Sequence, residues 1–429
     1  MIDRHSPYHK IHFIITNRRN NATGTVKNNG GDPFGENGLD RENRLKYAGA
    51  VKNSTDRRKD MPADRIKALN KTKPCSEALA HPGWEELLAL LALYGVEDAA
   101  EAGLMDTSHD GLDIRWNYIL DKKYVLRLTN APEMTEARLD DLNRLIARYN
   151  AFGLRCPAFL RGKDGRFFHS WGRLTVYLSE YVDLPVAGET DLTEAEQDAL
   201  REEVVLSLAR FMARYRDVDL IPIMGMYSLF DLCPYDAPLG VDEKQQNMDT
   251  VCAALRKWGA ESLAQKLAAR NGGVRSRLLQ IFRSLPRCVT QGDENFTNVL
   301  LDDEHHMAGL IDFNLAGTDV CVNLIANNAD FNLDVMNDQP WDDPAAVLEK
   351  ALASYRKNAA MLLAVYPASQ AEQAALADYA WIALASQWPY ACAFTDRLEK
   401  EACRASTLAL LSLIAELDMD RLAVYAAHP

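Results

Sequence analysis

The sequence predicts an α+β protein in which a small antiparallel-sheet lobe is followed by a larger, mainly helical lobe. Residues 81–182 contain short segments of alternating apolar and polar residues around one amphipathic helix. Beyond Pro185 the apolar residues recur with helical spacing over long stretches. One strand-rich segment, residues 288–314, interrupts those helices. We therefore expect an N-lobe at 81–182 and a C-lobe at 183–429.

Length and composition exclude several classes of protein. With 429 residues and 48% hydrophobic composition, the chain can bury large cores. No apolar run approaches the roughly 20 residues that a membrane span needs, and the N-terminal "IHFII" is shorter than the apolar core of a signal peptide. We expect a cytoplasmic protein with no membrane partner. The 8 cysteines include no C-x-x-C pair, which argues against a disulfide framework or a zinc site.

Charge is divided unevenly along the chain. Residues 1–80 hold 16 Lys and Arg against 9 Asp and Glu, so their net charge is +7. The whole chain has a net charge of −13, so residues 81–429 carry −20. The basic segment 1–80 is rich in Asn and Gly, and such a composition favours disorder. A basic tail can bind nucleic acid, but no aromatic interleaving or recognisable module accompanies it. The sequence favours a solvated tail over a nucleic-acid-binding one.

The elements of the N-lobe follow in order. A helical pattern starts at Trp84, and "DIRWNYILDKKYVLRL" predicts two strands joined at Asp121-Lys122. An amphipathic helix follows, with Asn130 as a candidate N-cap, and ends at Gly153. Further short strands, with "KDG" as a turn, extend to the polar stretch "SEYVD".

The C-lobe is predicted to be helical except for one island. The periodic stretches are about 191–217, 242–270, 272–284, 343–366, 370–394 and 400–424. In the island, "RCVTQ", "NVLLD" and "MAGLIDF" predict strands, and the turn "DEHH" joins the last two.

The island also carries the residues with the clearest chemistry. Asp293 follows Gly292 after a buried strand, so its carboxylate can lie at the wall of a cleft. Asn298 and Asp312 come at the two ends of the predicted hairpin, and their oxygens suit Mg²⁺, which takes few protein ligands and keeps water and phosphate oxygens. Asp293 is then free to orient or deprotonate a hydroxyl. The competing interpretation is a hairpin whose Asp and Asn residues cap turns.

A family resemblance supports the first interpretation. "QGDENFTN" followed by "GLIDFNLAGTDVCVNLIA" resembles the His-Gly-Asp-x4-Asn and Ile-Asp-Phe/Trp motifs of the aminoglycoside phosphotransferase/choline kinase family, which shares the protein-kinase fold. The resemblance covers about residues 105–395 and is strongest at 288–325. It implies a protein-kinase-like bilobal fold with ATP and Mg²⁺ between the lobes. Through it, Asp293 looks like the catalytic base, and Asn298 and Asp312 look like the Mg²⁺ ligands.

The resemblance also implies a phosphate-binding side chain on a strand. Arg127 in "KYVLRL" aligns with the family's Lys or Arg that contacts the ATP phosphates, a role that its fork of donors suits. Its expected partner on the following helix is Glu136, with Asp141 as second choice.

Two further segments complete the implied nucleotide site. "LSEYVD" resembles the linker between the lobes, where the backbone of Glu180, Tyr181 and Val182 would bind adenine. "DTSHDGLD", with Ser108 and Gly111, would be the loop that covers the phosphates.

Two positions depart from the family pattern. Gln291 replaces the usual His, and Asn323 replaces an Asp. Neither change removes the base or a metal ligand. Gln291 nevertheless keeps a second function open, that of a nucleotide-binding pseudokinase with a regulatory or scaffold role.

The acceptor is less constrained by the sequence. The acidic body of the protein, residues 81–429, would suit a cationic acceptor such as an amine, an amino sugar or an amino acid. A net negative charge also increases solubility, however. Trp381 and Trp388 lie seven residues apart and would share one helical face, either as core or as a box for an alkylammonium group. The sequence thus predicts a Mg-ATP-dependent kinase for a small molecule, cationic if the acidic body reflects the acceptor. It carries no signal for the oligomeric state.

Overall fold

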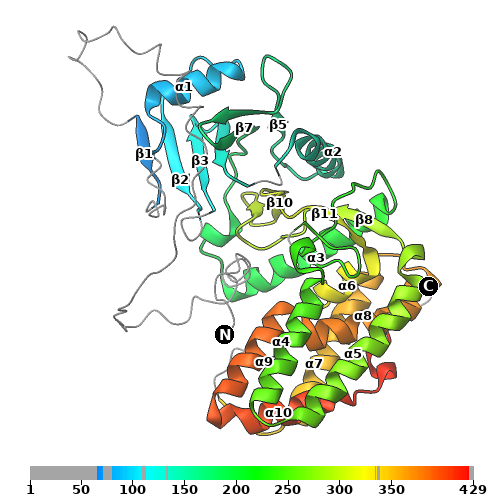
Figure 1. Cartoon of the computed structure of the whole chain (residues 1–429). Coiled ribbons are helices and arrows are strands. Elements are labelled where there is room, and N and C mark those ends of the chain that lie inside the picture. Colours follow the sequence, from blue (N-terminus) through cyan, green and yellow to red (C-terminus); the bar gives the residue numbers. More distant parts are fainter. Residues whose placement is uncertain are drawn as a thin grey trace, which may run out of the picture.

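The computed structural model describes residues 65–70, 80–108, 113–131, 134–234, 236–333, 335 and 339–424. A sheet with α1 and α2 beside it forms one lobe, and a group of long helices forms the other (Figure 1). The predicted α+β architecture is confirmed. In the described part of the chain, no helix is long and apolar enough to cross a membrane.

The N-terminal lobe is built on a seven-stranded sheet. Its order is β1-β2-β3-β4-β7-β5, and β6 also pairs with β7. The strands are β1 (Ile66–Ala68), β2 (Ala102–Asp106), β3 (Arg115–Leu120), β4 (Tyr124–Thr129), β5 (Phe159–Leu160), β6 (Phe168–Trp171) and β7 (Leu174–Glu180). Only the β1–β2 pair is parallel. β1 lies within residues 1–80, where no ordered element was expected. The sequence missed it because a three-residue edge strand has almost no periodic signal.

The alternation of side chains divides the two faces of this sheet. Leu128 of β4 and Val176 of β7 are buried in one cluster with Leu87 of α1 (Trp84–Leu93). Arg127 and Tyr177 are directly opposite each other on those two strands, so they share the other face. The hairpin between β3 and β4 turns at Asp121 and Lys122 as predicted, and both have positive φ.

Helix α2 (Glu136–Phe152) covers that second face. Its N-cap is Thr135, whose side chain accepts a hydrogen bond from the Arg138 amide. The prediction of Asn130 as the cap was therefore wrong, and the Asn130 side chain instead accepts a hydrogen bond from the Ile114 amide. The helix ends at Gly153, as predicted, with a φ of 106°.

The C-lobe contains eight described α-helices. They are α3 (Glu194–Tyr215), α4 (Glu243–Lys257), α5 (Glu261–Ile281), α6 (Cys321–Asn328), α7 (Pro344–Leu363), α8 (Gln370–Ser386), α9 (Trp388–Glu399) and α10 (Glu401–Ala415). The stretch predicted as one helix over 242–270 is broken at Gly259, whose φ is 76°. The stretch predicted over 370–394 is also two helices, because α9 starts with Pro389 in its first turn. Trp381 and Trp388 consequently do not share a helical face, and Trp381 is a core residue whose indole donates to the Ile414 carbonyl.

Two small sheets lie between the lobes. β9 (Val299–Leu301) and β10 (Met307–Leu310) form the predicted hairpin, and β8 (Arg287–Thr290) pairs with β11 (Gly317–Val320). At the hairpin tip, His305 and His306 contact Glu196 and Glu203 of α3. The tip is therefore attached to the C-lobe, and the open end of the hairpin faces the loop that follows β8.

Candidate active site

The loop after β8 is organised by Gln291. This side chain is fully buried, and its amide nitrogen donates to the carbonyls of Ile311 and Asp312 at 2.9 and 2.6 Å. Its amide oxygen accepts from the Asp293 amide at 2.6 Å. One neutral side chain thus connects the two loops that carry the predicted base and metal ligands.

Gly292 gives this loop its conformation. Its φ is 81°, and a Cβ placed on it would lie 2.8 Å from the carbonyl oxygen of Leu315. A side chain would be strained by the backbone and would also collide with the neighbouring loop. The glycine therefore permits the close approach that brings Asp293 beside the segment after Asp312.

The Asp293 carboxylate is held by two amides. Asn295 Nδ2 donates to Oδ1 at 2.7 Å, and Asn298 Nδ2 donates to Oδ2 at 2.9 Å and to the Asp293 carbonyl at 2.9 Å. Burial, followed by the charge of Asp312, raises the pKa of Asp293 from 3.8 to about 7. A carboxylate with such a pKa is suited to exchange a proton near neutral pH.

Asn298 and Asp312 lie together at the open end of the β9–β10 hairpin. The ladder pairs Val299 with Leu310, and the Ile311 amide then donates to the Asn298 carbonyl at 2.9 Å. The Asn298 side-chain nitrogen donates only to Asp293. The side-chain oxygen of Asn298, Oδ1, accepts no hydrogen bond within the described residues, so it is available to a metal ion. Asp312 adopts a left-handed backbone with a φ of 56°.

The donor set of this pair fits Mg²⁺. An amide oxygen and a carboxylate are hard ligands, and Mg²⁺ retains several non-protein oxygens. In the described part of the chain, no three His, Cys, Asp or Glu residues form a group that could hold a metal. A metal at Asn298 and Asp312 would therefore take its remaining ligands from water or from a bound phosphate.

Arg127 approaches the same place from the sheet. Its side chain is directly opposite Tyr177 in the β4–β7 ladder, and the charges of Arg127 and Asp312 both act on the Tyr177 phenol. Arg127, Tyr177 and Asp312 are thus brought together from β4, β7 and the end of the hairpin, although they are far apart in the sequence.

The expected helix partner of Arg127 is engaged elsewhere. The Glu136 carboxylate accepts hydrogen bonds from the Phe167 and Phe168 amides at 2.9 to 3.1 Å, and Asp141 pairs with Arg144. Among the described residues no ion pair joins Arg127 to either acid. The expectation of a strand–helix ion pair is therefore wrong, because Glu136 caps the start of β6 from the first turn of α2.

The linker between the lobes follows β7 directly. The Glu180 carboxylate accepts from the Ala158 amide at 3.0 Å, and the Tyr181 amide donates to the Lys123 carbonyl at 2.8 Å. Only the Val182 amide among these three has no backbone acceptor within the described residues. Val182 is therefore the residue of this linker whose backbone N–H is best placed to bind the adenine ring of a nucleotide.

The loop predicted to cover the phosphates is described in part. The Ser108 hydroxyl is buried and accepts from the Arg115 amide at 2.9 Å, so it braces the connection between β2 and β3. Gly111 lies outside the described residues.

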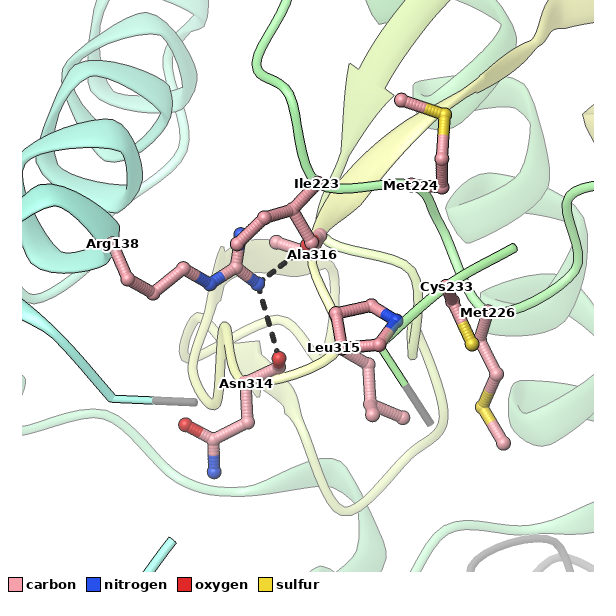
Figure 2. Close-up of a pocket in the computed structure, with 9 residues that line it drawn as sticks. Arg138, Ile223, Met224, Met226, Cys233, Asn314, Leu315 and Ala316 are labelled. Carbon is pink, nitrogen blue, oxygen red and sulfur yellow. Dashed lines mark hydrogen bonds between the residues drawn. The ribbon is translucent and has the colours of Figure 1, made fainter. Parts of the chain in front are cut away.

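One residue of the site was missed by the sequence. Arg138 of α2 is buried and donates to the carbonyls of Asn314 and Ala316 at 3.1 and 2.5 Å (Figure 2). A signal was present, because Arg138 stands on the same helical stripe as Leu142, Leu145 and Tyr149. A charge on an apolar stripe indicates a buried polar partner.

The carbonyls that Arg138 contacts belong to a small pocket. Figure 2 shows Arg138 from α2 on one side and the segment after Asp312 beside it. The lining residues are Arg138, Ile223, Met224, Met226, Cys233, Pro234, Asn314, Leu315 and Ala316. The pocket is therefore formed by α2, the loop between α3 and α4, and the loop that carries the predicted metal ligand.

Comparison with known proteins places this geometry in a family context. Residues 111–321 match the model of the phosphotransferase enzyme family. A comparison with curated proteins finds no significant match.

Similar solved structures are all distant in sequence. An aminoglycoside phosphotransferase from Alicyclobacillus acidocaldarius is 14% identical with a TM-score of 0.44, and the match covers 81% of this chain and 96% of that one. The amicoumacin kinase hAmiN, in complex with AMP-PNP, Ca²⁺ and Ami, is 12% identical with a TM-score of 0.40, over 76% and 90% of the two chains. A microcompartment-associated aminopropanol kinase is 11% identical with a TM-score of 0.38, over 78% and 96%. With TM-scores below 0.5, these structures carry no argument about the reaction of this chain.

Proposed function

We propose that this chain, whose residues 111–321 match the phosphotransferase enzyme family, transfers the γ-phosphoryl group of ATP, with Mg²⁺, to a hydroxyl of a small molecule. The observation that carries the proposal is the contact between Asp293 and Asn298 at the hairpin end that also bears Asp312. This arrangement places a carboxylate of raised pKa beside a pair of hard oxygen ligands.

Each residue has a defined role in the proposed reaction. Asp293 orients the acceptor hydroxyl and accepts its proton at a carboxylate oxygen. Arg127 contacts the phosphates, and Asn298 and Asp312 hold the metal. When bound, the metal neutralises charge on the phosphate oxygens. Most of the rate enhancement would come from positioning and charge stabilisation.

Acidic groups near Asp293 support a cationic acceptor. The phenol of Tyr227 lies within the electrostatic influence of Glu243, Asp293 and Glu294, and burial raises its pKa. Glu243 Oε2 is buried without a hydrogen-bond partner in the described part of the chain, although the charge of Lys244 partly compensates that carboxylate. An ammonium group on the acceptor would be attracted by these acidic groups.

The nucleotide site is tested by calorimetric titration of ATP into the full chain, with and without Mg²⁺. We expect binding that Mg²⁺ strengthens, and we expect Asp312→Ala to lose that strengthening. Asp303→Ala is a matched control, because Asp303 is exposed in the turn of the same hairpin. An absence of ATP binding by the unmodified protein would contradict the proposal.

The catalytic role is tested by turnover with amines, amino sugars and amino acids as acceptors. We expect Asp293→Asn to keep Mg-ATP binding and to lose turnover by about 10²- to 10⁴-fold. Unchanged turnover in this variant would show that Asp293 is not the catalytic base. ATP binding without transfer to any acceptor would instead favour the nucleotide-binding pseudokinase that Gln291 kept open.

A further inference from the structure

We propose that the phenol of Tyr177 positions the Arg127 guanidinium for the nucleotide phosphates, in the place where a carboxylate of α2 was expected. This inference rests on the proposed nucleotide site. It concerns a residue on the central sheet that no sequence motif singled out.

The sheet brings the two side chains together. β4 and β7 are antiparallel neighbours, and their register sets Arg127 directly opposite Tyr177. The residues before and after each of them, such as Leu128 and Val176, are buried on the other face against α1. Because side chains alternate between faces, Arg127 and Tyr177 must both point towards the face that α2 and the hairpin end share.

Tyr177 is held rigidly. It is only 3% exposed, and its ring makes an edge contact with Phe159 at 5.6 Å between centroids. Burial raises the pKa of Tyr177, and the charge of Arg127 opposes that rise. The group opposite Arg127 is therefore a neutral phenol at physiological pH, with an oxygen that can accept a hydrogen bond from the guanidinium.

The two acids of α2 that were expected to pair with Arg127 have other partners. Glu136 is bound to the amides that start β6, and Asp141 is bound to Arg144. The Arg127 Nε atom is buried and has no hydrogen-bond partner among the described residues. The phenol is the polar neighbour that the strand register places directly across from this side chain.

The difference between a phenol and a carboxylate changes the charge of the site. A carboxylate partner would cancel most of the guanidinium charge, whereas a neutral phenol orients the group and leaves its full positive charge. Arg127 should therefore contribute to phosphate binding even without a divalent ion. Asp312 is the acid whose charge lies nearby, and a bound metal would offset it.

The test compares ADP with adenosine, both titrated into the full-length protein without Mg²⁺. We expect Tyr177→Phe to weaken ADP binding about tenfold, the size expected for one hydrogen bond to a charged group, and to leave adenosine binding unchanged. Tyr118→Phe is a matched control, because it removes a buried phenol hydroxyl bonded to His81 on the opposite face of the same sheet. It should not change the affinity for either ligand.

A double-mutant cycle separates positioning from a general structural effect. In an Arg127→Met background, Tyr177→Phe should cause no further loss of ADP affinity. Equal losses with and without Arg127, or equal losses for ADP and adenosine, would overturn the inference. Unmodified protein that binds neither ATP nor ADP would instead contradict the proposed function itself.

Discussion

At the scale of single residues, Gln291 shows how a neutral side chain can hold two loops together. Its amide satisfies two carbonyls and one N–H that belong to different loops. An imidazole at this position could make fewer of these contacts at once, because its two ring nitrogens offer one donor and one acceptor when neutral. The replacement of His by Gln is therefore compatible with an ordered catalytic loop.

We expect Gln291→Leu to lower the free energy of unfolding by about 2 to 4 kcal/mol, because it leaves the Asp293 amide and the Ile311 and Asp312 carbonyls without partners in a buried place. Urea denaturation measures this change. Gln265→Leu, at an exposed position of α5, is the control and should have almost no effect. Equal unfolding midpoints for the two variants would show that the loops do not depend on the Gln291 amide.

The motif predicted which residues meet, but it did not predict every contact. Asp293 and Asn298, which the motif assigned to one site, are in direct contact, because a five-residue loop can fold the amide back onto the carboxylate. The partner of Arg127 could not be found in the same way. Tyr177 lies 50 residues further along the chain, and only the pairing of β4 with β7 reveals the contact.

At the scale of elements, α2 is connected to the loop after Asp312 by Arg138. The guanidinium donates hydrogen bonds to the carbonyls of Asn314 and Ala316, in a loop that forms neither helix nor strand. The helix and the loop should therefore be ordered together.

We expect Arg138→Met to lower the free energy of unfolding by about 2 to 3 kcal/mol, because two buried carbonyls lose a charged donor. We also expect weaker strengthening of ATP binding by Mg²⁺, since the loop that presents Asp312 is no longer held. Arg144→Met, on the same helix, removes exposed ion pairs with Asp141 and Asp219 and should cost less than about 1 kcal/mol. Chemical denaturation and calorimetry of both variants check these values. Equal destabilisation by both would contradict the role of Arg138.

The elements that the sequence missed share a physical cause. β11 is a four-residue strand that exists because it pairs with β8, and α6 is an eight-residue helix packed in the core. Their stability comes from tertiary contacts rather than from a periodic pattern. The break at Gly259 was overlooked because apolar residues continue with helical spacing across it, whereas a φ of 76° ends the helix.

At the scale of the whole molecule, buried carboxylates should make stability depend on pH. Asp319 is almost completely buried, and this burial raises its pKa from 3.8 to about 6, against opposing contributions from the Val320 amide and Lys244. The folded protein therefore binds this proton more tightly than the unfolded chain does. The stabilisation of the folded state by this proton is fully present below pH 3.8 and is lost as the pH rises through about 6.

We expect the free energy of unfolding of the unmodified protein to fall between about pH 4 and pH 6. In Asp319→Asn, which keeps the size of the side chain but cannot ionise, this fall should be smaller by up to about 3 kcal/mol. Denaturation at a series of pH values measures both profiles. Superimposable profiles would show that Asp319 is not protonated preferentially in the folded state.

The packing of α2 has a consequence for how the molecule moves. Although α2 precedes the interlobe linker in the chain, its buried residues Leu142 and Tyr149 belong to the core of the helical lobe. Arg155, just after the helix, forms backbone hydrogen bonds with Ala308 and Leu310 of the hairpin. Helix α2 is also bonded to the sheet, because Glu136 accepts from the Phe167 and Phe168 amides and Asn143 bonds to the Phe159 backbone. The helix therefore connects the sheet to the hairpin, and any outward swing of the sheet that moved Arg127 away from Asp312 would have to break one of these two sets of contacts.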